Sequence, residues 1–251
     1  MPQLEMLLIN FHFPVPNRDV ERQLMRTPIM THDTLPNLRT FALYAVSAYS
    51  EAVLNGITAS HLEDFQICYH EQLTFSVPQL VQFIGRTENL RLDRTKFNFH
   101  SELVFVQVNP FENNISEDAF SMLVDCWHLD WQVSSVARIS NALSQIFSSM
   151  EYLTLSHEVH SLSSEERNEV DRTEWRKLLR SFSNVKYLDF QDGRVMELSR
   201  CLRLDDGEHP LELLPELQEI TYPGSSKADG AFTSFIDARQ KAGRPVTLIK
   251  S

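Results

Sequence analysis

The sequence predicts an α/β protein: one irregular solenoid domain over residues 1–251, with a parallel sheet on its concave side and helices outside. Three observations support this prediction. A short apolar pattern recurs along the chain, segments with helical spacing of apolar residues lie between its copies, and the region around residues 95–130 alternates apolar with polar residues instead.

The recurring pattern is an apolar residue, two variable residues, a second apolar residue, one variable residue and a third apolar residue. Pro or Ser stands two positions before the first apolar residue of each copy. The copies are Leu4-Leu7-Ile9, Leu38-Phe41-Leu43, Leu62-Phe65-Ile67, Met150-Leu153-Leu155, Val185-Leu188-Phe190 and Leu217-Ile220-Tyr222. This is the strand signature of a leucine-rich repeat. It predicts that each copy contributes one short strand to a common sheet.

The segments between these strands are expected to form the outer helices, because their apolar residues recur every three or four positions. The clearest segments are Val77-Leu80-Val81-Ile84, Val136-Leu143-Phe147, Trp175-Leu178-Leu179-Phe182 and Phe232-Phe235-Ile236-Arg239. Residues 245–249 are predicted to form a terminal strand. Strands and helices that alternate along the chain favour a parallel sheet.

Residues 95–130 interrupt the pattern, since 88 residues separate the first anchors Leu62 and Met150 and no clean copy lies between them. Phe97 and Phe99, and then Val104, Val106 and Val108, alternate with polar residues. Alternation of this kind is typical of half-buried strands. We therefore predict extra strands here, forming a hairpin that decorates the solenoid.

Composition narrows the classes of function. The 23 Lys and Arg residues against 34 Asp and Glu give a net charge of -11, which disfavours nucleic-acid and anionic membrane partners. Cys68, Cys126 and Cys201 are far apart, so no disulfide framework or Cys-rich zinc module is indicated. With no signal peptide and no apolar stretch long enough to span a membrane, we expect a soluble cytoplasmic or nuclear protein.

The sequence offers three weak candidates for chemistry, and we favour a structural interpretation of each. His157 and His160 are three residues apart, whereas a zinc helix needs histidines four apart. The sequences Cys68-Tyr69-His70 and Cys126-Trp127-His128 are compatible with a shared site, but buried cysteines and hydrogen-bonded histidines within repeat strands are the favoured explanation. Asp125 and Asp130 flank Trp127 and Trp131, which we interpret as exposed acids beside core aromatic residues. No catalytic residue, metal ligand or cofactor site is therefore predicted.

The candidate binding surface consists of the variable positions within the strands. If the anchors point into the core, the side chains between them point out on the concave face. The candidate stripe comprises Tyr44, Asp64, Gln66, Tyr152, Thr154, Tyr187, Asp189, Gln191, Glu219 and Thr221. Tyr152 and Tyr187 occupy the same motif position and should stand side by side, either as a structural ladder or as a partner contact.

Together with the repeat pattern, residues 16–24 (PNRDVERQL), 128–136 (HLDWQVSSV), 171–179 (DRTEWRKLL) and 243–248 (GRPVTL) resemble a large family of leucine-rich-repeat proteins from mushroom-forming fungi. Many members of that family carry an N-terminal F-box. The resemblance covers almost the whole chain but includes no catalytic motif.

No Asn stands eight positions after any first anchor, so the repeats should be irregular. The chain also begins on a repeat strand, which leaves no room for an F-box and leaves the first edge in need of a cover from upstream residues, another chain or a second copy.

We therefore expect a non-enzymatic protein-binding module. The resemblance implies the substrate-recognition region of a ubiquitin-ligase adaptor, with Skp1 and cullin as partners if an F-box precedes the chain. One alternative is a stand-alone scaffold or sensor without a ubiquitin link. The other is an enzyme with an Asp/His site near residues 125–160, which requires a deep pocket with converging titratable groups.

Overall fold

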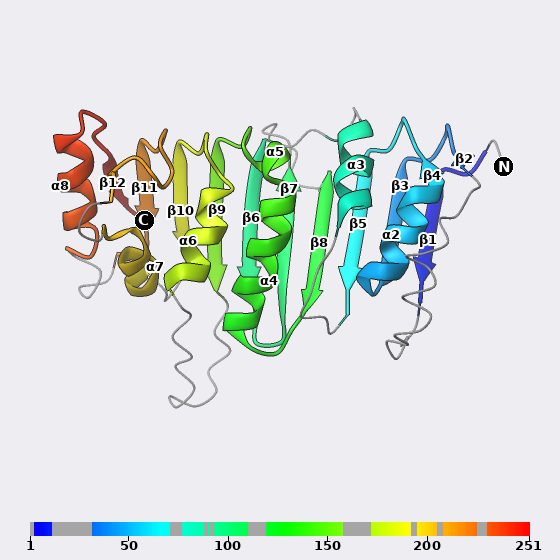
Figure 1. Ribbon diagram of the computed structural model, residues 1–251, viewed down its shortest axis with the longest axis horizontal. Coiled ribbons are helices and arrows are strands. Elements are labelled where there is room, and N and C mark those ends of the chain that lie inside the picture. The colour runs from blue at the N-terminus through cyan, green and yellow to red at the C-terminus, as the bar shows by residue number, and fades with distance from the viewer. Residues whose placement is uncertain are drawn as a thin grey trace.

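The computed structural model describes residues 3–11, 32–70, 77–87, 90, 93–109, 119–157, 172–191, 195–204, 208–224 and 230–251. Within them, the chain forms a ten-stranded sheet with helices on one face (Figure 1). The strands of this sheet are β1 (Met6–Asn10), β3 (Thr40–Ala45), β5 (Asp64–Tyr69), β6 (Arg94–Phe99), β7 (Leu103–Asn109), β8 (Phe120–Asp125), β9 (Tyr152–His157), β10 (Tyr187–Gln191), β11 (Glu219–Tyr222) and β12 (Thr247–Lys250). Two short strands, β2 (Asp33–Thr34) and β4 (Ile57–Thr58), pair separately.

The sheet order is β1-β3-β5-β8-β7-β6-β9-β10-β11-β12. Every pair is parallel except the two that β7 makes, with β6 and with β8. The predicted mostly parallel α/β sheet is therefore confirmed. All six motif copies and the terminal segment form strands of this sheet.

The prediction for residues 95–130 was wrong in one respect. The extra strands do not decorate the sheet, because β6, β7 and β8 form an antiparallel meander at its centre. The chain passes from β5 to the far side of the meander and returns through β7 to β8, which pairs with β5. The meander therefore joins the N-terminal strands to the C-terminal strands.

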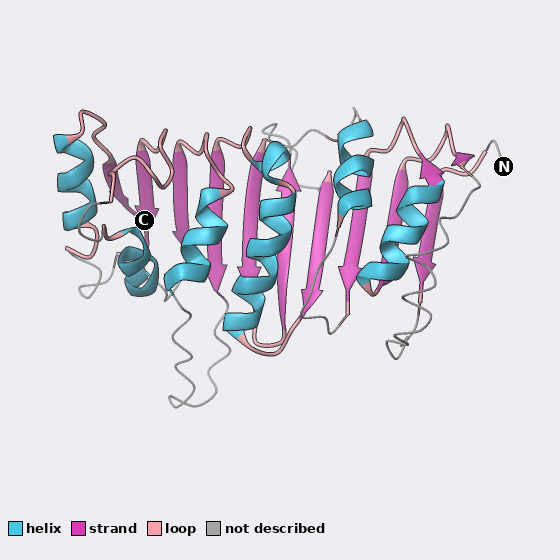
Figure 2. Ribbon diagram, in the orientation of Figure 1, coloured by secondary structure: helices cyan, strands magenta, loops and turns pink. Residues whose placement is uncertain are grey.

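The described helices are α2 (Ser47–Gly56), α3 (Pro78–Arg86), α4 (Leu129–Ala142), α5 (Ser144–Phe147), α6 (Arg172–Arg180), α7 (Val195–Leu202) and α8 (Thr233–Lys241). Each crossover between parallel strands steps toward the β12 side of the sheet. Since such crossovers are right-handed, they place their helices on the same face. Figure 2 shows these helices in a row in front of the strands. The predicted helical segments correspond to α3, α4 with α5, α6 and α8, while α2 and α7 were not predicted.

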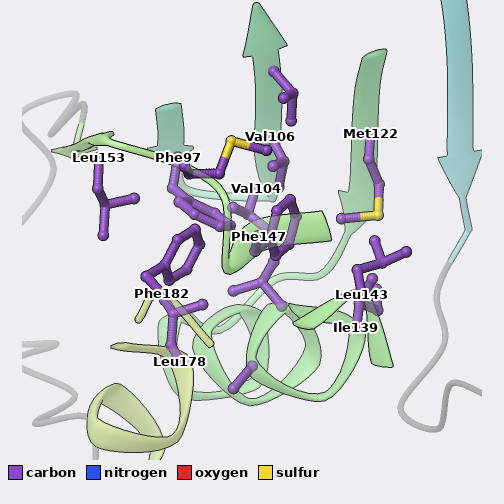
Figure 3. Packing of buried hydrophobic residues seen from close by; sticks show 14 of the residues in the cluster. Phe97, Val104, Val106, Met122, Ile139, Leu143, Phe147, Leu153, Leu178 and Phe182 are labelled. Atoms are coloured by element: carbon purple, nitrogen blue, oxygen red, sulfur yellow. The ribbon is translucent and has the colours of Figure 1, made fainter. Parts of the chain in front are cut away.

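The core lies between this row of helices and the sheet. The middle motif anchors are in register across neighbouring strands, as in Leu153, Leu188 and Ile220 on β9, β10 and β11. The meander continues the core, with alternating side chains of β7 fully buried. In Figure 3, Phe97, Val106 and Met122 from the meander face residues of α4, α5 and the end of α6. One layer of buried side chains thus runs beneath all the helices.

Candidate functional site

The open face of the sheet is the face opposite the described helices. On most of its strands every second residue is buried in the core, and the residues between them point to the open face. The strand register aligns these outward residues into a row that crosses all ten strands. The row is Leu8, Ala42, Gln66, Ser121, Gln107, Lys96, Thr154, Asp189, Thr221 and Ile249.

All ten residues of the predicted stripe lie on strands at positions facing the open face. The meander separates them into two groups. Tyr44, Asp64 and Gln66 lie on β3 and β5, and Tyr44 Oη donates a hydrogen bond to Gln66 Oε1 at 2.9 Å. The other seven lie on β9, β10 and β11. The stripe is therefore two patches with the meander between them.

Tyr152 and Tyr187 do stand side by side, as their motif positions predict. Their ring centroids are 4.4 Å apart and the rings are nearly parallel, at 12°. The Arg94 guanidinium carbon lies 4.7 Å from the centroid of the Tyr152 ring. Since β6 and β10 lie on opposite sides of β9, Arg94 and Tyr187 cover opposite faces of that ring. Partial desolvation and the neighbouring Tyr187 raise the pKa of Tyr152, so its hydroxyl stays protonated and able to donate.

An ion pair borders the two tyrosines. Lys186 Nζ donates to Glu151 Oε1 at 2.5 Å, and both residues directly precede the stacked rings in sequence. This hydrogen bond to Glu151 raises the pKa of Lys186, so the lysine remains charged. The pair holds one charge of each sign at the margin of the aromatic stack.

Sequence reasoning missed the outward residues of the meander. Arg94 and Lys96 on β6, and Phe105 and Gln107 on β7, face the same side as the predicted stripe. The signal was available, because the alternation that identifies Phe97 and Phe99 as buried also places the residues between them outside.

Where the structure describes them, the residues of the weak chemical candidates do not form a reactive centre. β5 and β8 are neighbours, yet Cys68 faces Leu123 in the register, and Cys126 lies beyond the end of β8. Burial, with Asp125 adding to it, raises the pKa of Cys68 to about 12, so its thiol is neither a nucleophile nor a ready metal ligand at neutral pH. In the described part of the chain, no group of three or more His, Cys, Asp and Glu side chains is arranged to hold a metal ion.

Asp125 and Asp130 are separated by their elements. Asp125 ends β8, where its Oδ2 lies 4.0 Å from His70 Nδ1, whereas Asp130 lies in the first turn of α4. The interpretation of the flanking tryptophans as core residues was wrong, since Trp127 is 60% exposed and Trp131 is 43% exposed. Trp127 lies in the bend before α4 and Trp131 lies in the first turn of α4, and the T-shaped contact of Trp131 with His128 is on the surface.

A small cavity lies at the carboxyl ends of β9 and β10. Its volume is about 10 Å³, and its lining is Phe99, Leu155, Ser156, His157, Trp175, Phe190, Gln191 and Leu198. That volume is close to the minimum for one water molecule. Among the described lining residues only His157 is titratable, and its neighbours 158–160 lie outside the described residues. The described lining therefore offers no set of converging acids and bases.

None of the described helices is both long and apolar enough to cross a bilayer. Comparison of the chain with protein-family models, with curated proteins and with solved structures finds no match. The open face is thus the candidate functional site on its own geometry.

Proposed function

We propose that the chain is a protein-binding module built as an irregular leucine-rich-repeat solenoid, and that the open face of its sheet contacts the partner. One observation carries the proposal. All described helices lie on one face, and the other face presents aligned side chains across ten strands. Repeat proteins use such extended surfaces for binding. The stacked tyrosines support it further, because tyrosine is enriched at protein interfaces.

The resemblance to fungal F-box proteins extends this proposal. In that form the open face selects a protein for ubiquitination, and a docking module elsewhere contacts Skp1 and cullin. The alternative is a stand-alone scaffold or sensor. β1 is an edge strand of the sheet with Met6 66% exposed and Leu8 61% exposed, which fits a cover over this edge in either form.

The test is affinity capture from basidiomycete cells with the wild-type chain and a Tyr152→Ala/Tyr187→Ala variant. We expect the variant to stay folded and to lose at least one reproducible partner, because truncating interface tyrosines often costs more than about 1 kcal/mol each. A matched control changes Trp127 and Trp131, also exposed aromatic residues but away from the stripe, to Ala. Loss of the same partner in the control alone would contradict the assignment of the open face. Recovery of Skp1 and cullin separates the adaptor from the scaffold.

A further inference from the structure

The most distinctive part of the open face is its central tract, the outward side chains of β6, β7 and β9. Arg94 and Lys96 are its charged residues, and its other members are amides, hydroxyls and apolar groups. The neighbouring strands on both sides present carboxylates, with Asp125 on β8 and Asp189 on β10. A chain of net charge -11 therefore presents a positive tract of three strands bordered by negative charge.

The two cations have a defined spacing. Arg94 and Lys96 are two residues apart on one strand, so their Cα atoms are separated by roughly 7 Å. Alternate side chains of any extended peptide repeat at the same distance. An extended segment aligned with β6 thus brings two acids, one residue apart, over Arg94 and Lys96. Lys96 makes no ion pair among the described residues, which leaves its charge available to such a segment.

The aromatic residues beside the cations favour a peptide over a nucleic acid. Both faces of the Tyr152 ring are covered, by Arg94 on one side and by Tyr187 on the other. Proteins that bind single-stranded nucleic acid use open ring faces on which bases stack. The stack leaves the ring edges for the ligand, and because the edge of an aromatic ring is its positive side, the edges attract carboxylates and peptide carbonyls.

We propose that the central tract binds an extended acidic segment of a protein partner, in which Asp or Glu residues alternate with uncharged ones. This inference rests on the proposed function and specifies the chemistry of the partner. Arg94 and Lys96 pair with the acids, and the edges of the stacked Tyr152 and Tyr187 rings contact the same segment.

The test uses a fluorescent peptide in which glutamate alternates with threonine, and the same peptide with glutamine in place of glutamate. We expect the glutamate peptide to bind roughly five-fold more tightly at low salt, with the difference shrinking as salt screens the charges. An Arg94→Gln/Lys96→Gln variant should lose this preference. The matched control, Lys177→Gln/Lys241→Gln, removes two positive charges from α6 and α8 on the helical side and should keep it.

Equal binding of the two peptides, or equal loss in the two double variants, would overturn the inference. Tighter binding of an oligouridylate than of the glutamate peptide would also overturn it, in favour of nucleic acid. If the peptides fail but the Tyr152→Ala/Tyr187→Ala variant still loses its captured partner, the proposed function stands and the acidic segment does not. If the Arg94→Gln/Lys96→Gln variant loses the preference for the glutamate peptide but the Tyr152→Ala/Tyr187→Ala variant loses no captured partner, the acidic-segment inference stands. The assignment of the stacked tyrosines to the partner contact then fails.

Discussion

Two regions of the sheet are connected differently but both have one buried and one open face. They are the C-terminal block, β9 to β12 with α6 to α8, and the central meander, β6 to β8. In the block, successive strands are parallel, and crossovers connect them. In the meander, β6 and β7 are antiparallel and separated by residues 100–102 only. The apolar motif therefore accompanies crossovers, and simple alternation accompanies the meander. Both keep the register, because a slip by one residue would turn the buried side chains of a strand outward.

The two regions also differ in which buried side chains donate hydrogen bonds to backbone carbonyl oxygens. In the C-terminal block, Arg239 is fully buried and donates to the carbonyl oxygens of Leu214, Pro215 and Leu217 at 3.0 to 3.2 Å. In the meander, Gln132 of α4 donates through Nε2 to the carbonyl oxygens of His100 and Cys126, both at 2.8 Å. A charged group thus serves the block where a neutral amide serves the meander.

The substitution with the largest expected effect, Phe182→Ala, tests whether the two regions fold as one unit. Phe182 is fully buried after α6, stacks on Phe147 with centroids 5.1 Å apart and makes an edge contact with Phe97 of the meander at 5.9 Å. We expect Phe182→Ala to lower the free energy of unfolding by about 3 to 5 kcal/mol while unfolding remains one transition. Urea denaturation followed by fluorescence and by circular dichroism measures both.

Phe105 provides the matched control for that substitution. It lies on β7 but on the open face, and it is only half-buried. Phe105→Ala should cost about 1 kcal/mol, since it removes fewer packed atoms. Two separate transitions in the Phe182→Ala variant would show that the block and the meander are independent units.

The same comparison shows what the sequence can and cannot predict. The six motif strands follow from local spacing, and the placement of the stripe follows from the two-residue period of a strand. The sheet order does not follow, because pairing β5 with β8 instead of β6 is a long-range choice that no local pattern encodes. Helix α2 was missed because Ser47, Ala48 and Ser50 pack with small side chains rather than a large apolar stripe.

Substitution of Arg239 and of Gln132 compares the charged and the neutral side chain directly. Arg239→Met leaves three carbonyls without their donors and should lower the free energy of unfolding by about 3 kcal/mol. Gln132→Met leaves two carbonyl oxygens without their donor and removes no charge, so we expect the free energy of unfolding to fall by about 1.5 kcal/mol. Urea denaturation of both variants at neutral pH gives the ranking. Equal losses would mean that the cost of burying the Arg239 charge offsets its extra hydrogen bond.

The smallest expected effect concerns the N-terminal strands, where a partly buried carboxylate bonds to backbone N–H groups instead of carbonyl oxygens. Glu51 of α2 accepts hydrogen bonds at the start of α3, from the Gln79 N–H at 2.6 Å and the Leu80 N–H at 3.1 Å. Burial raises the pKa of Glu51 to about 7, against the opposing effect of these two hydrogen bonds. Between its ordinary pKa of 4.5 and about 7, the folded protein holds a proton that the unfolded chain has lost.

That proton makes the contribution of Glu51 to stability fall as pH rises through this window, since the unfolded state gains from ionisation that burial opposes. Glu51→Gln keeps one acceptor oxygen and cannot ionise. We therefore expect the free energy of unfolding of wild type, measured relative to Glu51→Gln, to decrease between pH 5 and pH 8 by about 1 kcal/mol, which allows for the partial exposure of the carboxyl. Urea denaturation of both proteins across this range provides the curves. Parallel curves would show that the N–H groups of α3 compensate for burial, so that the carboxylate, like Arg239, stays charged beneath its helix.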